Sequence, residues 1–259
     1  MCGIIGYVGN NNSVPYIIDG LKKLEYRGYD SAGISILQDG KLVTVRSVGK
    51  VAELEKAALL ANPKGNTGIG HTRWATHGKP SEENSHPHTD CTGDIVVVHN
   101  GIIENYLTLR DKLESRGHRF KSETDTEVIA HLIEENLLHV RAANDPDRLL
   151  KAVQKTNKEI AGAYAYGVLW ARTPGLLIGV KNQSPMVVGL GKDENFLASD
   201  VPAFLKHTNK VLFLEDGEIA LLHVDGVTLL DKDGQEKAAK PVKISWDQQT
   251  AEKGGYPHF

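Results

Sequence analysis

The order of the regular elements constrains the fold of this chain most. Strand-like stretches come first, helical stretches fill the middle, and strand-like stretches return after about residue 162. A parallel sheet requires strands and helices that alternate steadily, and this alternation is missing. We therefore predict an α+β fold.

Turn residues indicate where neighbouring strands reverse. Asp39-Gly40 joins two β-rich runs and predicts a hairpin, because both residues tolerate the positive φ of such a turn. Three more Asp-Gly pairs, eight to nine residues apart in the stretch 211–234, predict an antiparallel meander near the end of the chain.

Capping residues indicate where helices begin and end. Ser13 is placed to cap a helix that runs to Leu24, and Gly117 to end a second helix. Thr124 and Glu127 have the spacing of a capping box at the start of a third. A fourth helix is predicted over 145–156, with a proline in its first turn.

Composition excludes several classes of protein. The net charge of −3 argues against a nucleic-acid or membrane-surface protein, and no apolar stretch reaches the roughly 20 residues of a membrane helix. No signal peptide is visible. The cysteines are Cys2 and Cys91, which is typical of a reducing compartment, so we expect a cytoplasmic protein.

The last residues differ from the rest of the chain. From about Pro241 the sequence becomes polar and irregular, and it ends with Tyr256 and Phe259. We predict one domain over residues 1–240 and a linker over residues 241–259.

Cys2 is a candidate nucleophile. Removal of Met1 would give this residue both a thiol and a free α-amine, whose pKa of about 8 leaves a neutral fraction able to accept a proton. An N-terminal amine that acts as base for its own residue is a known form of nucleophilic catalysis. The alternative is a small buried thiol on a first strand.

The stretch "HTRWATHG" (71–78) could bind a carboxylate. Arg73 offers a planar fork of donors, and Thr76 and His77 add a hydroxyl and an imidazole. The alternative is a strand end whose arginine forms a structural salt bridge.

Two further stretches have a structural and a functional interpretation. In "VVVHNGIIEN" (96–105), Asn100 and Gly101 could supply the N–H donors of an oxyanion hole, or simply form a turn. In "SETDTEV" (122–128), Asp125 could bind an ammonium group, or complement a helix dipole.

Histidines crowd into the same region and raise the question of a metal. None forms an H-x₃-H pair, and no C-x₂-C pair occurs, so we predict no metal site and no cofactor. The group considered is His71, His77, His86, His88, Cys91 and His99.

Together these motifs resemble one family closely. The stretches "MCGIIGYVG", "LEYRGYDSAGI", "HTRWATHG", "VVVHNGIIENY", "SETDTEVIAHL" and "EKGGYPHF" are similar to the glutaminase domain of glucosamine-6-phosphate synthases. These are class II glutamine amidotransferases of the N-terminal-nucleophile hydrolase superfamily. The resemblance covers the whole chain and implies a four-layer αββα sandwich with two antiparallel sheets.

The resemblance also implies roles for individual residues. Cys2 would be the nucleophile, its own amine the base, and Asn100 and Gly101 the oxyanion hole. The remaining residues would bind glutamine, cover the site or support the N-terminus: Arg73, Thr76 and His77 on the carboxylate, Asp125 on the ammonium, Trp74 in a covering loop and Arg27 beside the N-terminus.

The activity implied is hydrolysis of L-glutamine to glutamate and ammonia. In the full-length enzyme, sugar-isomerase domains that this chain lacks would use the ammonia to make glucosamine 6-phosphate from fructose 6-phosphate, on the route to UDP-N-acetylglucosamine. The resemblance further implies a homodimer. The alternatives are another class II amidotransferase, such as an amidophosphoribosyltransferase, and a non-catalytic glutamine-binding module.

Overall fold

The computed structural model describes residues 2–75 and 78–245. The described strands form two sheets in which every paired strand is antiparallel to its neighbours. None of the described helices combines the length and apolar character needed to cross a bilayer.

The first sheet has eight strands. In spatial order they are β15 (Val242–Lys243), β11 (Lys210–Phe213), β9 (Val187–Leu190), β10 (Glu194–Ala198), β1 (Gly3–Gly9), β4 (Thr67–Arg73), β2 (Ser31–Gln38) and β3 (Lys41–Val48).

The second sheet has seven strands. In spatial order they are β14 (Glu236–Lys237), β13 (Val227–Leu230), β12 (Ile219–Leu222), β8 (Leu177–Asn182), β7 (Gly162–Trp170), β6 (Ile95–Ile103) and β5 (His88–Thr89).

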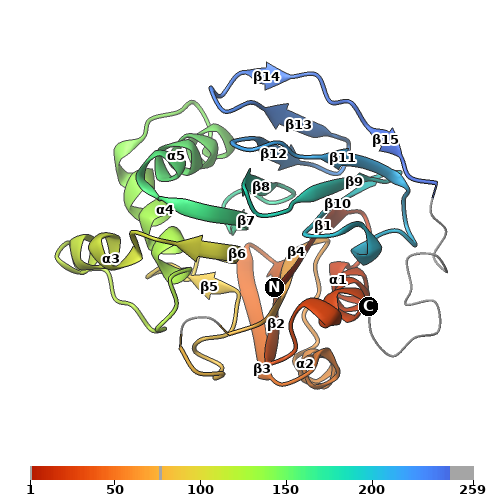
Figure 1. Ribbon diagram of the computed structural model, residues 1–259, viewed down its shortest axis with the longest axis horizontal. Helices are drawn as coiled ribbons and strands as arrows, with labels where there is room; N and C mark the ends of the chain where they lie inside the picture. The colour runs from red at the N-terminus through yellow and green to blue at the C-terminus, as the bar shows by residue number, and fades with distance from the viewer. Residues whose placement is uncertain (1, 76–77, 246–259) are drawn as a thin grey trace.

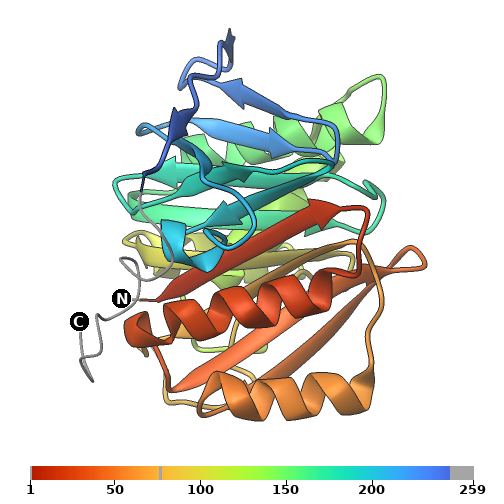
Figure 2. The same ribbon diagram turned by 90° about the vertical axis from the view of Figure 1, so that its right-hand side faces the viewer.

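Helices cover the outer faces of both sheets, as Figures 1 and 2 show. One side carries α1 and α2, and the other carries α4 and α5 with α3 beside them. The helices are α1 (Ser13–Leu24), α2 (Val51–Ala61), α3 (Tyr106–Glu114), α4 (Glu127–His139) and α5 (Asp145–Glu159), with short 3₁₀ turns η1 (Glu25–Arg27) and η2 (Val201–Ala203).

Three apolar clusters hold the layers together. One lies between α1, α2 and the first sheet, and another between α3–α5 and the second sheet. The third lies between the sheets and includes Ile4, Val96 and Leu197, all fully buried. Helix, sheet, sheet and helix therefore form the four-layer αββα sandwich, and the predicted α+β class is confirmed.

The turn predictions are only partly correct. Asp39 and Gly40 adopt positive φ between β2 and β3, as predicted. The meander exists only as β12–β13–β14, because β11 pairs with β9 in the other sheet. The first of the three Asp-Gly pairs, Asp216-Gly217, thus lies where the chain crosses between sheets.

Two capping predictions are wrong for one physical reason: the side chains in question bond elsewhere. The hydroxyl of Ser13 donates to the Gly65 carbonyl, and Asn12 caps α1 instead. The Thr124 hydroxyl contacts the Nε2 of His88 at 3.0 Å, and α4 begins only at Glu127.

The predicted linker over 241–259 is described only at its start. Val242 and Lys243 pair with β11, and the side chain of Ile244 is buried against the first sheet. Residues 246–259, with the two terminal aromatics, lie outside the described residues. The boundary at residue 240 stays a prediction.

Glycines without a side chain let the two sheets approach closely, and this yields a stability prediction. A Cβ on Gly179 of β8 would lie 2.4 Å from Cδ1 of Leu197 in the opposite sheet. We expect Gly179→Ala to lower the free energy of unfolding by about 1–3 kcal/mol, the usual effect of overpacking a core. Urea denaturation measures this change.

The matched control for this measurement is Gly226→Ala. A Cβ at Gly226 would meet no atom within 4 Å. We expect its midpoint to equal that of the unmodified chain. Equal midpoints for both variants would show that the sheets are not packed tightly at Gly179.

Candidate active site

Cys2 is held at the end of a central, fully buried strand. It immediately precedes β1, which lies between β10 and β4 and has all seven residues buried. Gly3 must be small, because a Cβ there would lie 2.7 Å from both Leu24 Cβ and Thr72 Oγ1. The Cys-Gly pair thus lets helix α1 and strand β4 close around the start of the chain.

Two donors hold the carbonyl of Cys2. Arg27 Nε donates to this oxygen at 3.0 Å, and Asn100 Nδ2 donates to it at 3.0 Å. Arg27 in turn forms an ion pair with Asp200 at 3.3 Å. The predicted supporting role of Arg27 therefore has a defined contact in the structure.

The thiol of Cys2 faces the backbone of Trp74. The Trp74 N–H donates to Sγ at 3.2 Å, and Sγ lies 3.5 Å from the Trp74 carbonyl. Burial raises the pKa of the Cys2 thiol, which keeps it protonated until a base accepts the proton. The Trp74 ring is about half exposed and stands edge-on to Tyr29, with centroids 5.6 Å apart.

His71 fixes the orientation of the Asn100 amide. Its Nε2 lies 3.0 Å from the His99 carbonyl and 3.1 Å from Asn100 Oδ1. Both of those atoms are acceptors, so Nε2 carries the hydrogen. With Oδ1 held in this way, the NH₂ group of Asn100 must point toward Cys2.

Gly101 follows on β6 with φ of +124°. A Cβ at this position would lie 2.0 Å from the Ala163 carbonyl oxygen. Any other residue would therefore push β6 away from β7 and displace Asn100.

Groups of opposite charge line the same pocket. Arg73, the last residue of β4, is buried and donates from Nη2 to the Gly78 carbonyl at 3.2 Å. Asp125 is also buried, and its Oδ2 accepts from the Ile103 N–H at 2.8 Å. Thr76 and His77 lie outside the described residues.

The pocket has a volume of about 370 Å³, within the range of small-molecule sites. It brings together most of the candidate residues described here. Its lining comprises Cys2, Arg27, Arg73, Trp74, His86, His99, Asn100, Gly101, Ile102, Thr124, Asp125, Thr126, Ser184 and Pro185.

Buried imidazoles support the pocket wall. His86 Nδ1 accepts from the His99 N–H at 3.2 Å, and the Thr126 hydroxyl lies 2.8 Å from His99 Nδ1. His71 stacks on His86 with centroids 3.9 Å apart. These histidines therefore bond or stack on protein groups beside Asp125.

Sequence reasoning missed residues that act one step behind the pocket. His71 was considered only as a metal ligand. Asp30, which accepts hydrogen bonds from the Ala75 N–H and the Ser31 hydroxyl, and Asp200 were not singled out. The signal available was a histidine, His71, on a strand whose seven residues are all buried.

Comparison with known proteins now identifies the family. A model of the glutamine amidotransferase domain matches residues 71–206, more than half of the chain. This chain belongs to the glutamine amidotransferase domain family.

Relatives of this glutamine amidotransferase domain extend the match to the whole chain. It is 52% identical over 259 residues to the glutamine–fructose-6-phosphate aminotransferase (isomerizing) of Aquifex aeolicus, and 51% identical over 267 aligned residues to that of Methanosarcina mazei. All of this chain is covered in both cases, but only 42% of each relative.

A solved structure supports the fold. The glutamine phosphoribosylpyrophosphate amidotransferase of B. subtilis superposes with a TM-score of 0.74 at 27% identity, over 91% of this chain and 50% of that one.

The buried imidazoles predict how stability changes with pH. Burial lowers the pKa of His88 to about 3, whereas an unfolded histidine titrates near about 6.5. Between these values the unfolded state binds more protons, so stability falls as pH falls below about 6.5. We expect His88→Gln to reduce this loss by up to about 1.4 kcal/mol per pH unit, measured by urea denaturation from pH 7 to pH 5.

The unmodified chain, measured over the same pH range, provides the reference slope. A slope in His88→Gln equal to that of the unmodified chain would contradict a neutral, buried His88.

Proposed function

We propose that this chain hydrolyses L-glutamine to glutamate and ammonia, with Cys2 as the nucleophile. The observation that carries the proposal is the convergence of Cys2, Asn100, Arg73 and Asp125 on one pocket from separate segments. Membership of the glutamine amidotransferase domain family supports it. The α-carboxylate of glutamine would pair with Arg73 and its α-ammonium with Asp125. Its side-chain amide would then face Cys2 and Asn100.

The charged residues would orient the substrate. Arg73 would bind the α-carboxylate with its planar guanidinium, and Asp125 the α-ammonium. Arg73 and Asp125 would thus bind the two charged groups at one end of glutamine. This fixes the position of the reactive amide at the other end. Thr76 and His77 are proposed to assist on the carboxylate, and Trp74 to cover the bound substrate.

The first half of the reaction would form a thioester. After removal of Met1, the neutral α-amine of Cys2 accepts the thiol proton, and Sγ attacks the amide carbon of glutamine. The C–N bond then breaks, and the α-ammonium returns the proton to the departing nitrogen, which leaves as ammonia. The nucleophile and the base belong to one residue, so no separate side chain is required as the base.

The second half would release glutamate. Water attacks the thioester carbon and gives up a proton to the α-amine, and that proton returns to the sulfur as the C–S bond breaks. In both halves the negative charge on the carbonyl oxygen would be stabilised by Asn100 Nδ2 and the Gly101 N–H. The Asn100 amide is suited to this role because its NH₂ group already faces Cys2 at 3.0 Å from the backbone carbonyl.

The first test concerns the nucleophile. We expect Cys2→Ala to abolish glutaminase activity while glutamine still binds, because the gripping residues are unchanged. Calorimetry measures binding and glutamate release measures turnover. A protein with Met1 retained should be inactive too, because an amide nitrogen is not a base. Mass spectrometry of the N-terminus provides the control, and full activity with Met1 in place would refute the mechanism.

The second test separates catalysis from binding. We expect Asn100→Ala to lower kcat by about 10²–10³ with little change in KM, the scale for one lost oxyanion donor. Asp125→Asn, which preserves shape, should instead raise KM about 10- to 100-fold, because it removes a charge-assisted contact. If Asn100→Ala changed only KM, Asn100 would belong to the binding residues.

We further propose that the ammonia serves amino-sugar synthesis. The relatives that share about half of the residues are named for transfer to fructose 6-phosphate, and this chain spans about two fifths of their length. Sugar-isomerase domains beyond a linker at 241–259 would supply that reaction, as a homodimer and on the route to UDP-N-acetylglucosamine. Two cysteines without a disulfide support the reducing cytoplasm as its compartment.

Phosphoribosylpyrophosphate amidotransferase is the competing assignment, since its structure superposes well. The higher identity to the aminotransferases, 52% against 27%, favours the amino sugar.

A further test asks whether this chain alone can make the amino sugar. The chain is incubated with glutamine and fructose 6-phosphate. We expect glutamate and ammonia but no hexosamine, because the sequence contains no glycine-rich phosphate-binding motif. Amino sugar made by this chain alone would contradict the proposal that separate sugar-isomerase domains carry out the second reaction.

A further inference from the structure

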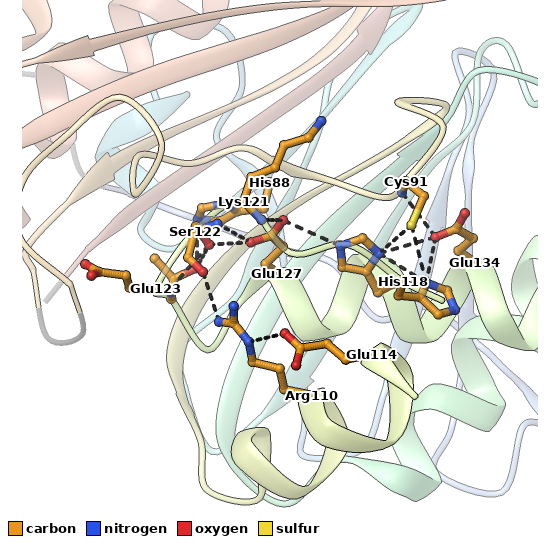
Figure 3. Close-up of polar contacts among 12 residues, drawn as sticks. His88, Cys91, Arg110, Glu114, His118, Lys121, Ser122, Glu123, Glu127 and Glu134 are labelled. Atoms are coloured by element: carbon orange, nitrogen blue, oxygen red, sulfur yellow. Dashed lines mark hydrogen bonds and ion pairs between the residues drawn. The ribbon is translucent and has the colours of Figure 1, made fainter. Parts of the chain in front are cut away.

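Four side chains that ligate metals elsewhere converge outside the pocket, as Figure 3 shows for three of them. Cys91 follows β5, His118 follows α3, and His131 and Glu134 lie one turn apart on α4. One ligand atom from each lies within 4.8 Å of the others. Residues distant in sequence are therefore brought to a single point.

The distances within this cluster match the edges of a tetrahedral zinc site. Zinc bonds of about 2.0–2.1 Å to nitrogen or oxygen and about 2.3 Å to sulfur require N···N and N···O edges of about 3.3 Å and S···N edges of about 3.6 Å. Cys91 Sγ lies 3.6 Å from His118 Nδ1 and 3.5 Å from His131 Nδ1.

Three further edges can be compared with these lengths. The two Nδ1 atoms of His118 and His131 are 3.2 Å apart. Glu134 Oε2 lies 3.0 Å from the first of these and 3.3 Å from the second. Five of the six edges therefore lie within about 0.3 Å of the lengths that one central ion would impose.

Carboxylates also lie behind both histidines. His118 Nε2 lies 3.3 Å from Glu135 Oε2, and His131 Nε2 lies 3.5 Å from Glu127 Oε1. Zinc-bound histidines commonly have a carboxylate beside the ring nitrogen that does not bind the metal.

The charge and access of the cluster suit a divalent ion. A Cys91 thiolate and the Glu134 carboxylate together carry two negative charges, which balance M²⁺. Glu134 is held in place by the Cys91 N–H, which donates to Oε2 at 3.1 Å. Cys91 is exposed, so an ion can reach the site from solvent.

We propose that Cys91 Sγ, His118 Nδ1, His131 Nδ1 and Glu134 Oε2 form a structural zinc site. Thiolate and imidazole ligands select zinc over magnesium and calcium, which prefer oxygen. All four positions of the tetrahedron are filled by protein, as in structural rather than catalytic sites. The ion would join the β5–β6 loop, the segment after α3 and helix α4. The proposal stands independently of glutamine hydrolysis.

The histidine-rich stretch considered in the sequence contributes only Cys91 to this cluster. The other ligands come from 27 to 43 residues further along the chain. Local spacing rules such as C-x₂-C cannot detect a site assembled in this way.

The test uses the complete 259-residue chain, stripped with a chelator and titrated with Zn²⁺ or Co²⁺. We expect one equivalent of each metal to bind. Co²⁺ should give the intense visible bands of tetrahedral coordination and a thiolate-to-cobalt charge-transfer band. Zn²⁺ should raise the unfolding temperature.

Variants assign the ligands. Cys91→Ser, at an exposed position that should not disturb folding, should abolish the charge-transfer band and weaken Zn²⁺ binding at least about tenfold. Glu134→Gln should weaken binding while keeping that band. The controls are Cys2→Ala, which removes the other cysteine, and His139→Gln, which removes an imidazole of α4 outside the cluster. Both should retain affinity and spectrum.

Three results would overturn the proposal. One is the absence of stoichiometric Zn²⁺ binding to the unmodified chain. Another is an unchanged affinity and spectrum in Cys91→Ser whose folding is verified by circular dichroism. The third is loss of the thiolate band in Cys2→Ala, which would place the metal at the nucleophile instead.

Discussion

The site depends on one contact between the two sheets, the hydrogen bond from Asn100 Nδ2 to the Cys2 carbonyl. Cys2 immediately precedes β1, a central strand of the first sheet, and Asn100 lies on β6 of the second. His71 adds a second polar link between the sheets through the His99 carbonyl. Much of the interface between the sheets is apolar, with residues such as Val98 and Leu197. The polar contacts at one end therefore orient the pocket, while the apolar contacts hold the sheets together.

Burial determines the electrostatics behind this contact. Burial lowers the pKa of His71 to about 3, so its imidazole is neutral at physiological pH. A neutral ring has one N–H, and the two acceptors beside Nε2 fix where it lies. A charged imidazole at the same position would repel the nearby Arg73 and a substrate ammonium. Neutrality thus lets His71 orient Asn100 without disturbing a zwitterionic ligand.

Local features of the fold were predictable from sequence, and long-range ones were not. Asp39-Gly40 specifies its hairpin by itself, because the backbone preference of two residues is enough. Asp216-Gly217 has the same preference, yet the chain leaves it toward the other sheet. Which sheet a strand joins depends on packing against distant residues. The predicted capping role of Ser13 is wrong for the same reason, because its hydroxyl donates instead to the carbonyl of Gly65, a residue distant in sequence.

The candidate site follows the same division. Cys2, Arg73, Asn100 and Asp125 were found because each lies in a motif with a chemical purpose, and the structure gathers them around one pocket. His71 acts only through its contact with Asn100, 29 residues further along the chain, so its role could not be predicted from local sequence. The Cys91 cluster could not be predicted from local sequence either, because its residues come from three separate segments.

Helix α4 connects the pocket to that cluster. Its first residue, Glu127, accepts from the N–H groups of Lys121 and Ser122 at 2.8 and 2.7 Å, and these residues precede Asp125 in the loop. Burial alone would raise the pKa of Glu127, but the nearby His131 imidazole, 3.5 Å away, and hydrogen bonds from Ser122 lower it to about 2. Glu127 therefore stays charged and holds the Asp125 loop from one side and His131 from the other. An ion bound to His131 would stabilise the position of Glu127 and, through it, one wall of the pocket beside Cys2.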